Sequence, residues 1–171
     1  DVYLAPGWTS YSHRIHYQTY DVTQALREDN ELCITVGKNW YAGVLGFVNM
    51  PNHYGDTTAA IAQLEVTYTD GRTQTVITDD SWEVGTGSER RGEIYDGETI
   101  DHTASFAAMG QAKVLDYTVE TLTAQRNEPV RIKQRLKPQR FLTTPKGETV
   151  LDFGQNLVGV IETELNLPRG T

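Results

Sequence analysis

Apolar and polar residues alternate over short stretches of this chain, most regularly in QLEVTYTDGRTQTVITD, residues 63–79. Two alternating runs flank Asp70-Gly71, a dipeptide that favours the two-residue turn of a β-hairpin. A turn of that length predicts three cross-strand pairs: Leu64 with Ile77, Val66 with Thr75, and Tyr68 with Thr73. This region is therefore predicted to be an antiparallel hairpin.

Further runs rich in β-branched and aromatic residues predict more strands at 14–22, 31–38, 113–123, 130–138 and 159–167. Residues 22–29, VTQALRED, are the one stretch that indicates a helix, with Thr23 as its cap. Many short strands separated by Gly and Asp turns are typical of an antiparallel sandwich. We expect helix below about a fifth of the chain. The expected sheet-on-sheet core includes four side chains: Leu32, Ile34, Leu64 and Val66.

The composition is that of an ordinary globular chain of 171 residues, with 38% apolar and 22% charged residues. No apolar run approaches the length of a membrane span. The net charge of −8 argues against a nucleic-acid partner, because phosphate binding needs a basic face. Residues 1–125 carry 7 Lys+Arg against 18 Asp+Glu, whereas residues 126–171 carry 8 against 5. This asymmetry predicts two domains, 1–125 and 126–171.

Several residues that often carry chemistry have simpler interpretations here. Cys33 is the one cysteine, so no internal disulfide forms, and we expect it to be a buried apolar side chain. His13 and His16 would point to opposite faces of a strand, which argues against a shared metal ion. The basic run 131–140 alternates with apolar residues, as the wet face of an edge strand does.

Residues 37–56 lack strand alternation and are rich in aromatic and amide side chains. A long loop of this kind lies at the end of a sandwich, where binding sites gather. Aromatic faces stack on sugar rings while Asn and Asp bind hydroxyl groups. The alternative is that Trp40 and Phe47 close one end of the core.

The stretch RGEIYDGETIDH, residues 91–102, contains four carboxylates within nine positions: Glu93, Asp96, Glu98 and Asp101. Four acids on one loop rarely face each other across a sugar, as a glycosidase pair must. Calcium prefers oxygen ligands of this kind, often on one irregular loop. Asp96-Gly97 is also an ordinary turn signal, and composition alone favours a solvated turn over calcium.

Longer blocks resemble a known family. Residues 4–23, 36–47, 54–82 and 93–101 are similar, in order, to the N-terminal module of bacterial α-L-rhamnosidases of glycoside hydrolase family 78. Residues 128–138 and 144–160 resemble the start of the next β-domain in those enzymes. The resemblance implies an all-β fold: an antiparallel jelly-roll sandwich of the galactose-binding type, followed by the first strands of a second β-sandwich.

The resemblance also implies what this stretch does not do. The family's catalytic carboxylates lie in a later α/α barrel, and the family pattern has a further β segment before residue 4. We therefore expect a fragment of an inverting rhamnosidase that contains no catalytic residue and does not cleave aryl α-L-rhamnosides alone. Its expected partners are the remaining domains of the parent enzyme and terminal L-rhamnose, with no nucleic acid and no membrane.

In some relatives the module binds rhamnose through calcium. The matching positions are Asp56-Thr57, Trp82 and Asp96-Gly97-Glu98. With Tyr54 and Asp101 added, we expect a carbohydrate site formed by Tyr54, Asp56, Thr57, Trp82 and Glu98, and a calcium site formed by Asp56, Asp96 and Asp101. Thr57 replaces a family Asn and Asp96 replaces a frequent Asn. We expect Asp56, Asp96 and Glu98 to converge at one end of the jelly-roll, where calcium would relieve their repulsion. The alternative is a purely structural domain that packs against the catalytic barrel and binds no ligand.

Overall fold

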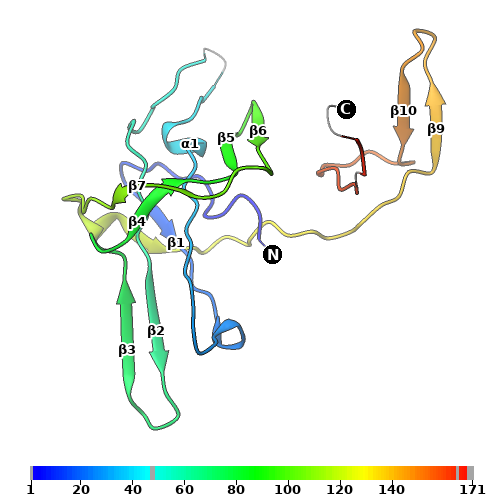
Figure 1. The fold of residues 1–171 in the computed structure, drawn as a ribbon. Coiled ribbons are helices and arrows are strands. Elements are labelled where there is room, and N and C mark those ends of the chain that lie inside the picture. Colours follow the sequence, from blue (N-terminus) through cyan, green and yellow to red (C-terminus); the bar gives the residue numbers. More distant parts are fainter. Residues whose placement is uncertain (1, 47–48, 165, 169–171) are drawn as a thin grey trace. The chain divides into compact units, whose positions relative to one another are not determined.

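The structure of the chain is a computed structural model that describes residues 2–46, 49–164 and 166–168 (Figure 1). Within these residues the regular elements are ten strands, one α-helix of 4 residues and two 3₁₀ helices of 3 residues each. The expected all-β class and the low helix content are confirmed. No helix among the described residues has the length and apolar character that crossing a bilayer requires.

The elements follow one another along the chain with short connections. The strands are β1 (Ile15–Tyr17), β2 (Gln63–Thr67), β3 (Thr73–Ile77), β4 (Glu83–Thr86), β5 (Glu89–Glu93), β6 (Gly97–Ile100), β7 (Ala107–Gln111), β8 (Leu122–Ala124), β9 (Arg140–Thr143) and β10 (Thr149–Asp152). The helices are α1 (Asn39–Ala42) and the 3₁₀ turns Thr23–Ala25 and Val119–Thr121.

The chain divides into two compact units, one of residues 4–128 and one of residues 129–171 with 1–3. In the second unit, β9 and β10 form a hairpin, and the Tyr3 amide donates to the Val130 carbonyl at 2.9 Å. The first unit contains the other strands. The domain assignment 1–125 and 126–171 stays a prediction.

The predicted hairpin at 63–79 is confirmed, but its predicted register is wrong by one residue. Leu64 pairs with Val76, and Val66 pairs with Gln74. The cause is the turn, since the Tyr68 amide donates to the Arg72 carbonyl at 2.8 Å and leaves three residues in the loop. Gly71 takes a φ of +86°, as the last residue of such a three-residue loop does.

A pair of distant strands joins the two ends of the first unit. β1 and β8 are parallel, with Ile15 opposite Leu122 and His16 opposite Thr123. The antiparallel pairs are β2–β3, β4–β7 and β5–β6, and β4–β7 has an irregularity between Val84 and Gly85. Each sheet among the described residues has two strands. The parallel pair differs from the purely antiparallel sandwich that the sequence predicts.

In the described part of the chain, several expected strands do not form, and the residues expected in the core are exposed or only half-buried. Residues 31–38 and 130–138 form no strand, nor do the described residues of 159–167. Leu32 is 49% exposed, and Cys33 is exposed rather than buried. Leu64, Val66 and Ile34 are half-buried, and Ala42 is the fully buried apolar residue of the described chain. Alternation predicts which face a strand would bury, but a strand also needs a partner along its length. Among the described residues of these segments, Val130 alone is paired, by an isolated bridge with Tyr3.

The predicted helix at 22–29 shortens to the 3₁₀ turn Thr23–Ala25. Its predicted cap is wrong, because Thr23 is the first residue of the turn, and Val22, which holds the cap position, makes no side-chain hydrogen bond to it. Instead Asp21 Oδ1 accepts the Thr23 amide at 3.0 Å. The aspartate two residues earlier therefore satisfies a free amide that a cap would otherwise bind.

Candidate functional site

The acid-rich stretch 91–102 forms most of the β5–β6 hairpin. Glu93 pairs with Gly97 and Gly92 pairs with Glu98, so the turn consists of residues 94–96. The four carboxylates consequently lie in different settings: the end of β5, the turn, β6, and the residue after β6. Glu93 is half-buried and its Oε2 accepts the Val44 amide at 3.4 Å, which ties this hairpin to the segment that follows α1.

Two of the predicted calcium ligands have local partners of their own. Asp96 forms an ion pair with Arg91 across the hairpin. Asp101 accepts the Thr103 hydroxyl at 2.6 Å and the Thr103 amide at 3.0 Å, and Arg90 lies 4.0 Å away. The hydrogen bonds from Thr103, and secondarily the charge of Arg90, hold the pKa of Asp101 below its ordinary value of 3.8.

The third predicted ligand, Asp56, is exposed and accepts the Thr57 hydroxyl at 3.0 Å. Calcium requires six to eight oxygen ligands around one point. Among the described residues, no group of three His, Cys, Asp or Glu side chains is placed to hold a metal ion. The residues as arranged do not fit the expected ion, because the structure does not bring Asp56, Asp96 and Asp101 together. The calcium site stays a prediction from the resemblance.

Three side chains of the loop 37–56 join two earlier residues in an aromatic cluster, which we define as Trp8, Tyr11, Tyr41, His53 and Tyr54. The ring of Tyr54 lies 4.9 Å from that of Tyr11, edge to face, and 6.4 Å from that of Tyr41, stacked. His53 meets Tyr54 edge to face at 4.7 Å. The Trp8 indole N–H donates to the Tyr54 hydroxyl at 3.2 Å. Tyr54 is therefore the centre of the aromatic cluster.

Backbone hydrogen bonds around α1 hold this cluster in place. The Asn52 amide donates to the Ala42 carbonyl at 3.2 Å, and the Tyr54 amide donates to the Tyr41 carbonyl at 3.3 Å. At Gly55 a Cβ atom would lie 2.5 Å from the Tyr41 hydroxyl, so the chain needs glycine to pass the ring. Burial, and secondarily the neighbouring Tyr54, raises the pKa of Tyr11 above its ordinary value of 10.0.

Gly55 separates Tyr54 from Asp56 and Thr57, so three of the predicted carbohydrate-binding residues lie within the segment 54–57. Trp82 lies elsewhere, at the base of the β2–β3 hairpin, and its indole N–H donates to the Ile77 carbonyl at 3.0 Å. Within the described residues, Trp82 makes no ring contact with the aromatic cluster. Glu98 is exposed on β6.

The sequence pattern did not single out Trp8 or Tyr11, because their partners in the loop lie 30 or more positions later in the chain. Trp8 and Tyr54, for example, are 46 positions apart. Nothing local in the sequence marks such a contact. Of the two side chains expected to close the core, Trp40 is half-buried, and Phe47 lies outside the described residues.

Comparisons with known proteins agree on one family. A family model described as the α-L-rhamnosidase N-terminal domain matches residues 1–134. An α-L-rhamnosidase of Streptomyces avermitilis is 39% identical over 98% of this chain and 17% of its own length. An α-L-rhamnosidase of Alteromonas sp. strain LOR is 36% identical over 98% of this chain and 20% of its own length.

Solved structures lead to the same family. The native α-L-rhamnosidase of Aspergillus terreus superposes with a TM-score of 0.78 at 34% identity, over 92% of this chain and 20% of that one. The Streptomyces avermitilis α-L-rhamnosidase complexed with L-rhamnose gives a TM-score of 0.73 at 33% identity, over 90% of this chain and 16% of that one. The chain thus spans a fifth or less of these proteins. It belongs to the α-L-rhamnosidase family, of which it is an N-terminal domain.

Proposed function

We propose that this domain is a non-catalytic accessory part of a larger α-L-rhamnosidase and that it binds a terminal rhamnose beside Tyr54. The observation that carries the proposal is the aromatic cluster around Tyr54, with the exposed polar pair Asp56 and Thr57 one glycine further along the chain. Aromatic rings offer a face to the C–H side of a sugar, and carboxylate and hydroxyl groups bind sugar hydroxyls.

The proposed recognition uses few side chains. Tyr54 is half-buried and held by its neighbours, so its side chain loses little conformational entropy when a sugar binds. Asp56 has one hydrogen-bonding partner among the described residues, Thr57, and keeps acceptor capacity for sugar hydroxyls. Only the family resemblance supports a role for Trp82 and Glu98 and a calcium ion between protein and sugar.

A titration of the chain with L-rhamnose, followed by calorimetry, tests the proposal. Asp56→Ala should weaken binding about tenfold, since a hydrogen bond to a charged group is lost. Asp29→Ala is the matched control, because Asp29 is also exposed and belongs to neither predicted site. If binding heat persists when a chelator removes calcium, the protein recognises rhamnose directly. If binding heat is seen with calcium alone, the calcium-assisted form is supported. No heat in either condition contradicts both.

The second candidate is a purely structural domain, which a different observation favours. In the unit of residues 129–171, apolar side chains stand in solvent, with Val158, Val160 and Ile161 between 80% and 106% exposed. Exposed apolar segments of this kind mark surfaces that pack against another protein part. The remaining domains of the parent enzyme are the proposed partner. Under this candidate, rhamnose binds nowhere on the chain, and the titration above decides between the two.

A further inference from the structure

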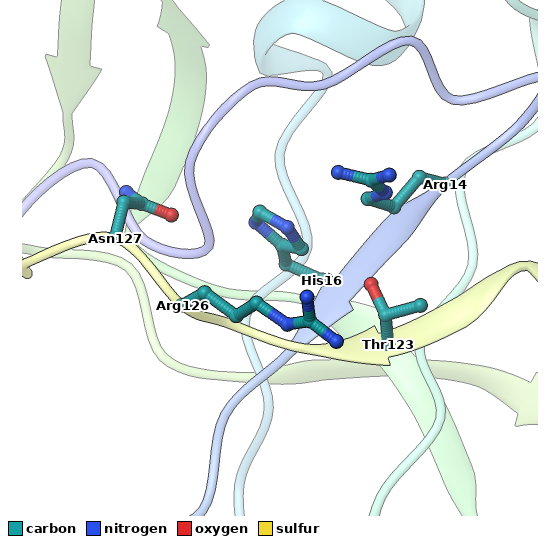
Figure 2. A pocket seen from close by; sticks show the side chains of 5 residues that line it. All are labelled: Arg14, His16, Thr123, Arg126 and Asn127. Atoms are coloured by element: carbon teal, nitrogen blue, oxygen red, sulfur yellow. The ribbon is translucent and has the colours of Figure 1, made fainter.

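A small basic pocket lies on the parallel pair of strands β1 and β8, and none of the residues predicted above to bind ligand lines it. Its volume is about 270 Å³, and five side chains line it: Arg14, His16, Thr123, Arg126 and Asn127 (Figure 2). No Asp or Glu is among them. In a chain whose net charge is −8, two arginines without a lining carboxylate form an unusual concentration of positive charge.

The backbone fixes where these side chains point. His16 and Thr123 are directly opposite each other in the parallel register, so their side chains leave the same face of the pair. The Gln125 amide donates to the Tyr17 carbonyl at 3.0 Å, which extends the pairing to the residue before Arg126. The Arg14 amide donates to the Ser10 carbonyl at 2.9 Å, so a turn holds the other arginine at the start of β1.

Polar groups in the pocket lack partners. The Nδ1 atom of His16 and the Oγ1 atom of Thr123 are both buried and make no hydrogen bond with any described residue. Neither the Arg14 nor the Arg126 guanidinium makes a hydrogen bond or ion pair within the described part of the chain. Figure 2 shows both guanidinium groups reaching toward the space around His16 and Thr123.

We infer that this pocket binds the oxyanion of an acidic saccharide, either a carboxylate or a sulfate ester. An oxyanion accepts hydrogen bonds only, and the pocket offers donors: two guanidinium groups, the Thr123 hydroxyl, the Asn127 amide and a ring N–H of His16. Charge-assisted bonds to guanidinium are the strongest of these. The saccharide class rests on the family and on the proposed carbohydrate role, whereas the oxyanion rests on the pocket alone.

The test is an NMR titration of the full chain with D-glucuronate, D-glucose 6-sulfate and neutral D-glucose, at low salt. We expect saturable shifts at His16 and Thr123 with at least one of the two anions and none with glucose. The two anions distinguish a carboxylate from a sulfate ligand. Arg126→Gln should weaken binding about tenfold or more, because a charge-assisted hydrogen bond is removed.

Arg131→Gln is the matched control, since it removes the same charge outside the pocket and should leave the affinity unchanged. Thr123→Val is a second variant that keeps the side-chain shape and removes the hydroxyl donor, and it should weaken binding severalfold. The inference is overturned if neither anion saturates, if glucose binds equally well, or if Arg126→Gln binds like the unaltered chain. L-rhamnose added in parallel reports on Tyr54, so failure of the basic pocket and failure of the proposed rhamnose site are seen separately.

Discussion

At the residue scale, aspartate has one recurring use in this domain. Five aspartates accept the backbone amide two positions later: Asp21, Asp70, Asp79, Asp101 and Asp152. Such Asx turns let a carboxylate stabilise a bend in the backbone. Five of the 23 acidic residues of the chain therefore stabilise turns, Asp101 of the acid-rich stretch among them, so a carboxylate there need not be part of a ligand site.

These turns predict how the domain responds to acid. Hydrogen bonds from Thr103 lower the pKa of Asp101 in the folded chain. The stabilisation is present above the ordinary value of 3.8 and is lost as pH falls through the lower folded pKa. In Thr103→Val the pKa of Asp101 should rise toward that ordinary value. NMR titration of the carboxyl group measures it, and Thr99→Val, an exposed change on β6, is the control. An unchanged titration midpoint in Thr103→Val would contradict this assignment.

Trp82 offers a second test at this scale. Its indole N–H donates to the Ile77 carbonyl, and Phe keeps most of the ring while removing that donor. Trp82→Phe should therefore lower the free energy of unfolding by about 1 kcal/mol. Urea denaturation measures the change. Tyr95→Phe removes a hydroxyl from a ring that is 67% exposed and should have no effect. Equal stability of both variants would show that the Trp82 hydrogen bond contributes nothing.

At the scale of elements, two hairpins share one turn design. In β2–β3 the Gly71 amide donates to the Tyr68 carbonyl at 2.9 Å, and in β9–β10 the Gly147 amide donates to the Thr144 carbonyl at 2.9 Å. Both glycines have positive φ, +86° and +83°. The sequences TDG and PKG thus form three-residue loops, and a glycine in third position sets the register of each hairpin.

This shared turn predicts the effect of adding a methyl group. Neither Gly71 nor Gly147 has an atom within 4 Å of a Cβ position, so Ala would meet no clash but would have to adopt a positive φ. Gly71→Ala and Gly147→Ala should each cost about 1 kcal/mol of stability. Gly87→Ala, also in open space and without positive φ, should be neutral or slightly stabilising. Urea denaturation midpoints of the three variants measure these effects. Three equal midpoints would contradict the assignment of the cost to the positive φ at Gly71 and Gly147.

The strands and turns also show which features of the fold could be predicted from the sequence. Alternation and a glycine turn are local, so the β2–β3 hairpin and the all-β class followed from sequence. The turn length was not evident, because Asp-Gly occurs in two-residue and three-residue loops alike, and the register was wrong as a result. The partners β1 and β8 and the contact of Trp8 with Tyr54 join distant positions, and no local pattern encodes them.

At the scale of the whole molecule, the domain represents a fifth or less of the rhamnosidases it resembles. Large apolar side chains are exposed in both units, among them Met109 at 77% and Ile161 at 85%. Such exposure is expected of a part that is covered by its neighbours in a larger protein. We propose that hydrolytic activity belongs to the parent enzyme and that the domain contributes binding or support.

The corresponding prediction concerns catalysis. The purified chain should not hydrolyse aryl α-L-rhamnosides, because an inverting glycosidase needs two carboxyl groups about 6.5–9.5 Å apart across the sugar, and we assign none here. A chromogenic rhamnoside assay over several hours measures this, with an active rhamnosidase as positive control. Turnover that disappears when one acid of the chain is replaced would contradict the prediction.

The pairing of β1 with β8 has a consequence for how the chain is made. The side-chain bond between Gln18 and Gln125 joins residues 107 positions apart, next to this pair. A ribosome adds about 5–20 residues each second, so β1 waits roughly 5–20 seconds before its partner exists. During that interval its edge is unpaired and open to other chains. We therefore expect translation speed and chaperones, as well as final stability, to influence how much of this domain reaches its folded state.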